Sequence, residues 1–512
     1  MKKILLTILT AIFAFSAQAQ TLRTSHFMET YTMRHMRNPA MSPMMGYVNI
    51  PVIGNLNANL LQTNMSLSNY LYPVKDKNGK DKLGLFLHPD VSSKEFLSNI
   101  GNREHIGFDA TATVLGFGFY TKRDKFWSFD LNVRSNFGFG LPKDLFAFFK
   151  DLEVGVGKTY SLSNLNLAGR AYVEAAFGHA RDINENIRVG VKIKPLIGIA
   201  DARFRFDDVT LFSDKEIVRF SAKASGSVLG NFVQFVDSAG IVQEITTAED
   251  FATNDLLGGF GAAIDLGVIW NLDNILENTL GVLVPFSLKG FTASFGITDI
   301  GFIRYKNAER VTFDKTISWE GVLIQKDENN DIVYNLDKFT DQGENIENDF
   351  RKDGDASRAR GLRTTTNLGL EYSFLNNKMS AGLLWSAHYG LPRVFNEWTL
   401  SYNLRPTNWF ALTLSSSVAH GFFRSAGWAI NLTPKYGFAL FLGMDYVPLF
   451  WTPEFDDLKL IPGRGLPIYS TNINLNFGMS IPLGGNRYHK FPSRKEQKRI
   501  AREAAVTDDT AH

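Results

Sequence analysis

The chain contains no cysteine, which excludes disulfide bonds and thiolate metal sites. Beyond residue 19 it also lacks an apolar run of about 18 residues, the length that a membrane-spanning helix needs. Neither sign of charge dominates: 54 Lys and Arg side chains stand against 52 Asp and Glu side chains, so the net charge of +2 gives no indication of a nucleic-acid partner. Aromatic residues are abundant instead, since Phe alone occurs 42 times among 512 residues.

The clearest pattern lies between residues 396 and 481, where apolar and polar residues alternate. In Trp398–Arg405, for example, Trp, Leu, Tyr and Leu alternate with Thr, Ser, Asn and Arg. A period of two predicts β-strands whose two faces lie in different environments. In one of these runs the predicted apolar face consists of Tyr436, Phe438, Leu440, Leu442, Met444 and Tyr446.

The polar face distinguishes between two all-β architectures. A soluble β-sandwich would turn the apolar face toward a core, and its outer face would usually carry Lys, Glu and Thr. Here the polar face is mostly Gly, Ser, Asn and Thr, and Trp and Tyr occur near the strand ends. This combination favours a transmembrane antiparallel β-barrel with lipid outside, a polar lumen and aromatic girdles.

The start of the chain also favours a barrel. Within Met1–Ala19, two lysines precede an apolar stretch, and Ala17-Gln18-Ala19 forms an A-x-A cleavage site. We therefore expect residues 1–19 to be a secretory signal peptide. No cysteine follows the cleavage site, so the mature chain is not expected to be a lipoprotein. Together these features predict a multi-pass barrel in the outer membrane of a Gram-negative cell.

The expected barrel occupies residues 46–483. Its alternating segments number about fourteen, an even number, as in single-chain bacterial barrels. Short turns alternate with longer connections, and the longest connections are two predicted excursions, Asp201–Asp255 and Arg304–Gly361. Because such barrels keep their short turns in the periplasm, we expect both termini there, including a basic tail at 484–512.

Residues 20–45 do not alternate in this way. They are rich in Met, whose flexible side chain fills irregular apolar gaps, and Pro39 and Pro43 prevent a continuous helix. We expect a hatch-like segment in the periplasmic mouth of the barrel. It would either plug and brace the barrel or gate the path of a ligand.

Charged residues recur on the strand face opposite the apolar one. This pattern predicts either a network of ion pairs that braces the lumen or a path for a substrate. The predicted lumen charges are Asp109, Asp130, Arg134, Arg170, Glu174, Arg188, Lys192, Lys194, Asp265, Glu371, Arg405 and Asp445.

No constellation of residues indicates an enzyme. Ser386 and His388 share the predicted lumenal face, but an outer-membrane hydrolase would also need an acidic partner, and none is placed beside them. We therefore expect no catalytic activity, no cofactor and no metal site.

Several short motifs resemble known barrel families. Asn38-Pro39-Ala40 resembles a box of the long-chain fatty-acid transporter superfamily, which contains fourteen-stranded barrels for hydrophobic uptake and barrel subunits of a secretion system that escort cargo. Nearly the whole mature chain is similar to an uncharacterised outer-membrane family, a domain of unknown function. That similarity is carried by residues 190–200, 263–267 and 298–303. It implies the fold and the location, and no established activity.

Two functions remain open. The first is porin-like transport of a small apolar molecule across the outer membrane. The second is a structural or escort role, in which the barrel docks other envelope or secretion proteins without transport. The corresponding partners are outer-membrane lipid, a small apolar ligand, and envelope proteins bound through the loops or the basic tail.

Overall fold

The computed structural model describes residues 22–483 except 52, 63–66, 76–80, 89, 123–124, 152–156, 164, 214–216, 231–256, 274–289, 321–323, 327–331, 335–350, 376, 390–394, 408, 420–421, 435–436, 453–464 and 466–471. The predicted signal peptide and basic tail lie outside the described residues. None of the described helices has the length and apolar character needed to cross a membrane.

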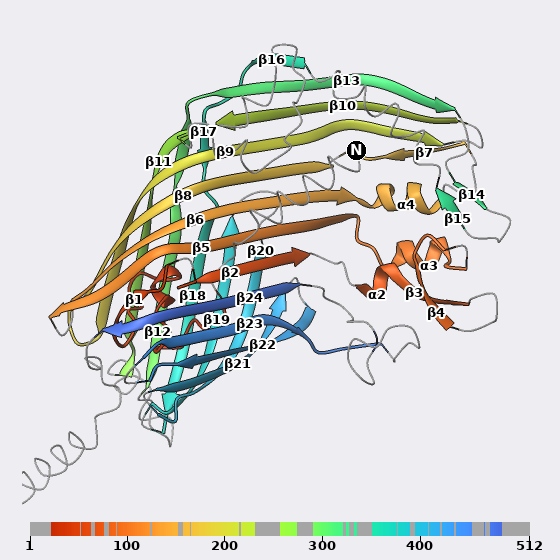
Figure 1. Ribbon diagram of the computed structural model, residues 1–512. Coiled ribbons are helices and arrows are strands. Elements are labelled where there is room, and N and C mark those ends of the chain that lie inside the picture. Colours follow the sequence, from red (N-terminus) through yellow and green to blue (C-terminus); the bar gives the residue numbers. More distant parts are fainter. Residues whose placement is uncertain are drawn as a thin grey trace, which may run out of the picture.

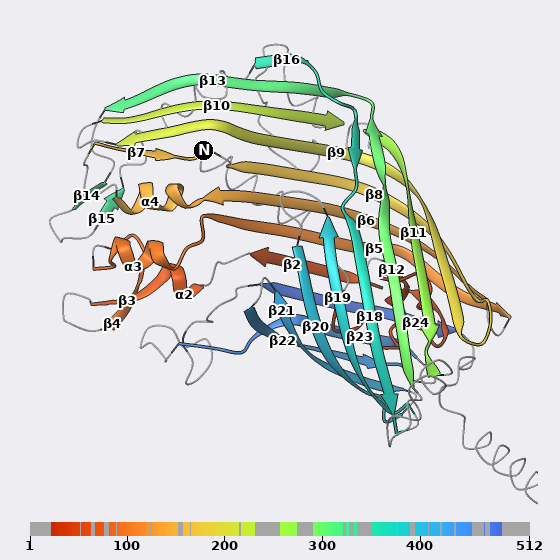
Figure 2. The same ribbon diagram turned by 180° about the vertical axis from the view of Figure 1, so that it is seen from behind.

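Counting the interrupted pair β1 and β2 as one strand, the described residues form a closed barrel of 14 antiparallel strands (Figures 1 and 2). The last strand, β24, pairs with β1 and β2, and these pair with β5, which closes the wall. The barrel strands are β1 (Gly46–Asn49), β2 (Leu56–Gln62), β5 (Arg103–Lys122), β6 (Lys125–Pro142), β8 (Asn166–Asp182), β9 (Ile187–Ser213), β11 (Gly259–Asn271), β12 (Phe291–Tyr305), β18 (Thr364–Phe374), β19 (Met379–Tyr389), β20 (Phe395–Leu404), β21 (Phe410–Ala419), β22 (Phe422–Leu432), β23 (Ala439–Pro448) and β24 (Ile473–Leu483).

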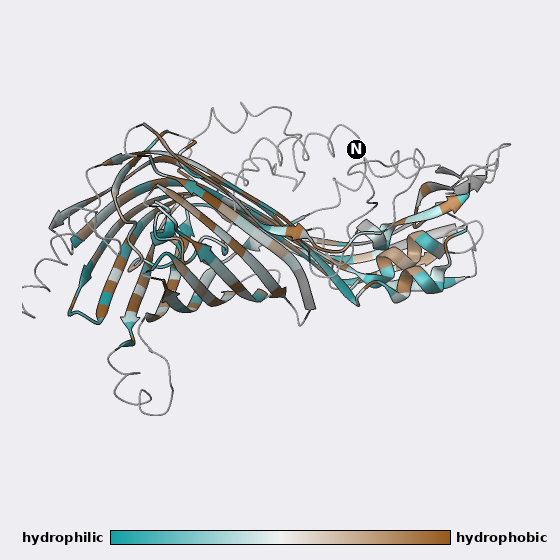
Figure 3. Cartoon of the chain, turned by 90° about the horizontal axis from the view of Figure 1, so that it is seen from below, coloured by the Kyte–Doolittle hydropathy of each residue, from teal (hydrophilic) through white to brown (hydrophobic). Residues whose placement is uncertain are grey.

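The alternation in the sequence corresponds to the two faces of the wall. On β20, Leu400 is 60% exposed to the outside, whereas its neighbours Thr399 and Ser401 are 1% and 4% exposed and face the lumen. Apolar and hydrophilic residues alternate in this way along the barrel strands (Figure 3). An apolar surface of this extent is costly in water and stable in lipid, so the transmembrane barrel predicted from the sequence is confirmed.

One wall position differs from the predicted alternation. Tyr446 was assigned to the lipid-facing side of β23, but it is 3% exposed and lies in the lumen. The cause is a register shift opposite Ala426–Trp428, where β23 has extra residues between Met444 and Val447. A β-bulge moves the following side chains to the opposite face.

The two predicted excursions are not loops throughout, and that expectation was wrong. β9 continues past residue 201 to Ser213, and beyond Ala200 it pairs with β10 (Ile217–Gly230) instead of β11. β10 then pairs with β13 (Ala308–Glu320), so three long strands extend the wall beyond the barrel (Figure 2). Strands of this length satisfy backbone hydrogen bonds that long irregular loops would leave unpaired.

Short elements cover this extension. The α4 helix packs on it through Phe148, which contacts Tyr160 in a cluster with Leu211 and Phe313. The remaining elements are η1 (Arg34–Met36), α2 (Leu67–Tyr70), β3 (Leu71–Lys75), β4 (Asp81–Leu85), α3 (Ser93–Ser98), α4 (Lys143–Asp151), β7 (Lys158–Ser161), β14 (Ile324–Lys326), β15 (Ile332–Tyr334), β16 (Arg351–Asp355) and β17 (Ala359–Gly361).

The short turns lie at the end of the barrel opposite the extension (Figure 1). The described chain enters and leaves the wall at this same end, because Gly46 pairs with Leu483. We call it the turn end and the opposite end the distal end. That the turn end faces the periplasm stays a prediction.

Candidate functional site

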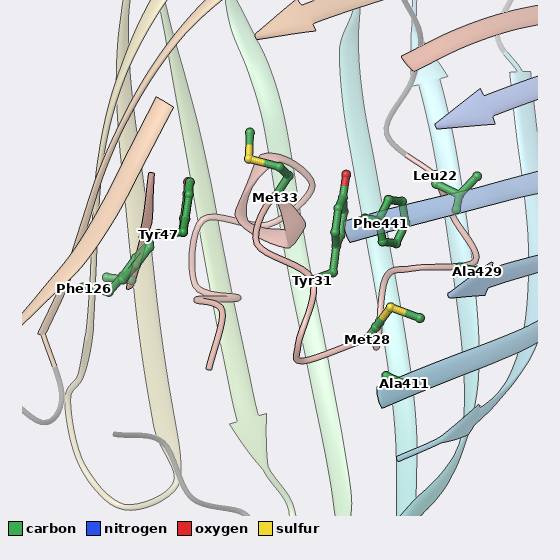
Figure 4. Packing of buried hydrophobic residues seen from close by; sticks show 10 residues of the cluster. Leu22, Met28, Tyr31, Met33, Tyr47, Phe126, Ala411, Ala429 and Phe441 are labelled. Carbon is green, nitrogen blue, oxygen red and sulfur yellow. The ribbon is translucent and has the colours of Figure 1, made fainter. Parts of the chain in front are cut away.

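Residues 22–45, which we call the N-terminal segment, lie inside the lumen near the turn end (Figure 4). Tyr31 stacks on Phe441 of the wall with ring centroids 3.8 Å apart. Leu22, Met28 and Met33 are fully buried in the same cluster. The sequence places Met and Pro in this segment, so it follows an irregular path with a single turn of helix, η1. Whether it acts as a hatch stays a prediction.

Glycines on the inner wall make room for the segment. A methyl group at Gly190 would overlap the backbone of Pro39 and Ala40, and one at Gly267 would overlap the side chain of Asn38. Five further glycines lie against the segment in a similar way: Gly296, Gly369, Gly382, Gly427 and Gly443. The wall therefore presents backbone to the segment, which allows a close approach that larger residues would prevent.

The Asn38-Pro39-Ala40 motif attaches the segment to two strands. The Asn38 side-chain amide donates to the backbone carbonyls of Val268 on β11 and Phe295 on β12, at 3.4 and 3.0 Å. Its oxygen accepts from the backbone N–H of Ala40 at 3.0 Å, which closes a local turn. The motif therefore has a structural role that its sequence resemblance did not define: it joins the segment to neighbouring wall strands.

Arg23 forms a buried ionic contact at the start of the segment. Its Nε lies 3.3 Å from Oε1 of Glu397, and its Nη2 lies 3.5 Å from Oδ2 of Asp445. The same guanidinium donates to the Tyr446 hydroxyl. Asp445 also accepts from the backbone N–H groups of Arg23 and Thr24, at 3.0 and 2.9 Å. Because these groups are buried, removing any one would leave others unpaired.

A second ionic contact lies nearer the middle of the segment. Arg405, on the wall, reaches Oε2 of Glu29 with Nη1 at 2.9 Å and Oε1 of Glu371 with Nη2 at 3.4 Å. Arg188 adds a third attachment, since its Nε donates to the Ala40 carbonyl at 3.0 Å. The segment is therefore held by charge-assisted contacts from several sides of the barrel.

Beyond the segment, toward the distal end, five charged groups form one network. Lys194 Nζ lies 2.6 Å from Asp265, 2.8 Å from Asp299 and 3.5 Å from Glu174. Arg134 Nη1 is 2.8 Å from both Glu174 and Asp299. Each carboxylate contacts at least one cation. That the network braces the lumen stays a prediction.

The network is located at an irregularity of the wall. The pairing of β11 with β12 shifts register between Ile264 and Leu266. Asp299 has a positive φ of 61°, and its backbone N–H donates to Oδ1 of Asp265 at 2.7 Å. The bulge aims both carboxylates at Lys194, and aspartate is one of the few residues other than glycine that adopt this backbone conformation.

His35 of the segment lies beside the remaining lumen charges, and its Nε2 forms a hydrogen bond with the Tyr47 hydroxyl. Its Nδ1 lies 3.7 Å from Asp130, which also pairs with Lys192 at 3.1 Å. Burial, together with the nearby ammonium groups of Lys192 and Lys194, lowers the pKa of His35 well below its usual range. Burial likewise lowers the pKa of His26 in the segment.

Every predicted lumen charge has an ion-pair partner, and the pairs join different strands. Asp109 pairs with Arg363 at 2.8 Å. Arg170 pairs with Asp201 at 2.7 Å and not with Glu174 on its own strand. The pairs involving the other predicted charges are Arg188–Asp182, Lys192–Asp130, Lys194–Asp265, Arg134–Glu174, Arg405–Glu371 and Arg23–Asp445.

Ser386 and His388 face the lumen as predicted, but they bond to other groups. Ser386 Oγ lies 2.8 Å from both Arg37 Nη2 and Asn367 Oδ1. Nδ1 of His388 lies 2.8 Å from the hydroxyl of Thr365. The first contact joins the segment to the wall, and the second joins the neighbouring strands β18 and β19.

Several of these ion-pair partners were not predicted from the sequence. Asp201 and Arg363 lie within or beside the regions predicted as excursions, so no face was assigned to them. Glu397 could have been found, because it alternates with Trp398 on a recognised strand. Arg23 gave no periodic signal, since the segment has no regular structure.

Two cavities lie on different sides of the N-terminal segment. The larger, of about 620 Å³, is at the turn end and is lined by apolar Phe27, Met41 and Ile269 and by charged Arg34 and Glu371, among others. The smaller, of about 50 Å³, is lined by segment residues Met36 and Arg37 and by the charged network around Lys194. The segment thus contributes a wall to both cavities.

A closed barrel with an outward apolar surface and a polar lumen defines an integral β-barrel of the outer-membrane type. The chain belongs to the family of unknown function DUF5723, whose model matches residues 39–445. No curated protein matches the sequence.

Solved barrels with remote similarity include hydrocarbon channels. A Pseudomonas aeruginosa FadL homologue is 10% identical over 92% of this chain and 100% of its own, with a TM-score of 0.37. The P. putida toluene transporter TodX is 9% identical over 88% and 94%, with a TM-score of 0.35. The CymD monoaromatic hydrocarbon channel is 8% identical over 90% and 94%, with a TM-score of 0.33. Similarity at this level carries no argument about function.

Proposed function

We propose that this barrel passes a small apolar molecule across the outer membrane and that the N-terminal segment closes the path. The observation that supports the proposal is the position of the segment between two lumenal cavities. The larger cavity, at about 620 Å³, has the size of a small-molecule site. Its Phe, Met and Ile side chains suit an apolar ligand.

Passage would require the segment to move. It contains no long regular element, and passage would have to break the buried polar and charge-assisted contacts and the close packing against glycines that hold it to the wall. A ligand that binds better to the displaced state would shift the equilibrium toward an open lumen. In this proposal the turn end faces the periplasm.

Deleting residues 21–43 tests the gate. We expect the shortened barrel to insert into liposomes and to leak a small encapsulated polar dye, which the full chain retains because a polar dye does not displace the segment. The control is Thr399→Ala/Ser417→Ala, which removes a wall hydrogen bond of 3.0 Å that does not involve the segment. A shortened barrel that inserts and stays as tight as the full chain would contradict the gate.

A structural or escort barrel is the second candidate, and the ion pairs favour it. The smaller cavity, of about 50 Å³, is bordered by paired charges that would oppose an apolar molecule. On this alternative, deletion of the segment lowers stability without a leak. Co-purification of cross-linked envelope proteins from native membranes would then identify what the barrel docks.

A further inference from the structure

Arginine side chains gather where β9 leaves the barrel and enters the extension. Five of them form what we call the arginine patch: Arg170, Arg203, Arg205, Arg310 and Arg360. The lumen charges described above involve only Arg170 from this set. The role of the patch is therefore separate from that of the lumenal ion pairs and from the proposed gate.

The strand register places the patch on one face of the sheet. Arg203 on β9 lies directly opposite Ser227 on β10, and Ser227 lies directly opposite Arg310 on β13. Residues directly opposite one another on antiparallel strands share a face. Arg360, on β17, joins this row because its Nη2 donates to the Ser227 hydroxyl at 2.7 Å. The three strands run side by side in Figure 1.

One carboxylate serves three of these arginines. Asp201 lies 2.7 Å from Arg170 Nε, and its Oδ1 lies 3.3 Å from the Nε atoms of Arg203 and Arg360. The side chains of Arg170 and Arg360 are only 8% and 13% exposed, so water screens their charges poorly.

The remaining two arginines, Arg205 and Arg310, do not pair with Asp201. Arg205 pairs with Asp207 at 2.7 Å. Arg310 has no ion pair among the described residues and is exposed. Among the described residues, the five guanidinium groups therefore share two ion-paired carboxylates, Asp201 and Asp207. Farther along the same strands, Lys223 lies 3.6 Å from Asp314.

The guanidinium groups of the patch indicate the class of ligand that it suits. A guanidinium group offers a planar fork of N–H donors that matches a phosphate in a bidentate manner. A phosphate monoester carries roughly −1.5 to −2 charges at neutral pH, which suits a site with several cations. The Thr312 hydroxyl lies opposite Ser225 in the next row, beside Arg205, and supplies a further donor, whereas the Ser225 hydroxyl donates to Asp207 at 3.1 Å.

We propose that the arginine patch binds a phosphate group at the distal mouth of the barrel. The phosphate belongs either to a soluble phosphorylated molecule or to the headgroup of a lipid. The recognising chemistry is the same in both cases. The site does not depend on the proposed passage, since a barrel that never opens could still bind phosphate there.

Calorimetric titration of the purified full chain with inorganic phosphate tests the site. We expect saturable binding that weakens by about tenfold or more in Arg203→Gln/Arg310→Gln, because charge-assisted hydrogen bonds are lost. Arg310→Lys should weaken binding less, since it keeps the charge and loses the fork. The matched control, Arg181→Gln/Lys378→Gln, removes two exposed charges at the turn end and should bind phosphate like the unmodified chain.

The source of the phosphate is distinguished by competition. Phosphatidic acid that displaces inorganic phosphate from the unmodified chain would identify a lipid headgroup site, and failure to displace it would identify a soluble ligand. Because Arg310 makes no ion pair among the described residues, the single variant Arg310→Gln is the version to use if the double variant does not fold. Absence of binding, equal binding by the patch variants, or equal affinity for acetate would overturn the proposal.

Discussion

Leu400→Arg should lower the free energy of unfolding by about 2–4 kcal/mol or prevent insertion into lipid vesicles. Leu400 lies midway along β20 and is 60% exposed on the outer face of the barrel. In a bilayer that face contacts hydrocarbon, where a guanidinium is costly. Urea titration of the vesicle-inserted protein measures the change.

The matched control is Leu85→Arg on β4, outside the barrel wall. Leu85 is also an exposed leucine, at 54%. Because it would contact water, the same substitution there should change the free energy of unfolding by no more than about 0.5 kcal/mol. Equal effects at the two positions would mean that the apolar face of β20 does not meet lipid.

Arg23→Met should destabilise the barrel by about 3–5 kcal/mol, because it leaves buried carboxylates without their cation. Glu397 and Asp445 both lie within 3.5 Å of the Arg23 guanidinium, and all three side chains are almost completely buried. The segment should also become accessible to protease. Urea unfolding and limited proteolysis of the same sample measure the two effects.

A double-mutant cycle separates the ionic contact from loss of packing. In Arg23→Met/Glu397→Gln one orphaned charge is removed, so the double variant should be less destabilised than the sum of its two single variants. Strict additivity would show that Arg23 contributes packing alone, and the ionic attachment of the segment would then be wrong.

The wall could be predicted from the sequence because membrane strands repeat one simple constraint. Each strand has one face in lipid and one in the lumen, so alternation alone assigns Leu400 to lipid and Asp265 to the lumen. The strand number and the lumenal faces of the predicted charges follow from the same rule. The rule fails where the backbone inserts a residue, as at Tyr446, because a bulge leaves no periodic trace of its own.

The ion-pair partners of the lumenal residues were harder to predict than the strand face on which each residue lies. The alternation predicts that Lys194 and Glu174 point inward, but it does not predict which of the inward-pointing charges form ion pairs. The contact of Lys194 with Asp299 depends on a local register shift and on an unusual backbone angle. The attachment of Arg23 depends on the path of an irregular segment. These features arise from tertiary packing and not from local pattern.

The extension was missed for a different reason. Residues 201–213 and 308–320 carry many charged residues and were treated as connections between barrel strands. Their alternation was present all the same, because Val209, Leu211, Val311 and Phe313 are buried and alternate with more polar neighbours. The pairing of β10 with β9 and with β13 is a tertiary outcome.

The most direct test of the central claim, that the N-terminal segment closes the lumen, is a reversible tether in this cysteine-free chain. Thr24 and Ser415 have hydroxyl oxygens 2.7 Å apart, one on the segment and one on the wall, so Thr24→Cys/Ser415→Cys places two thiols for a disulfide. The control pair, Thr399→Cys/Ser417→Cys, joins two wall strands whose hydroxyls are 3.0 Å apart. The measurement is the flux of a small apolar dye through the liposome-reconstituted barrel before and after reduction, after subtraction of the flux across protein-free liposomes. We predict that oxidation of the first pair stops the flux, that reduction restores it, and that the control pair has no effect. Unchanged flux with the segment covalently fixed to the wall would contradict the claim.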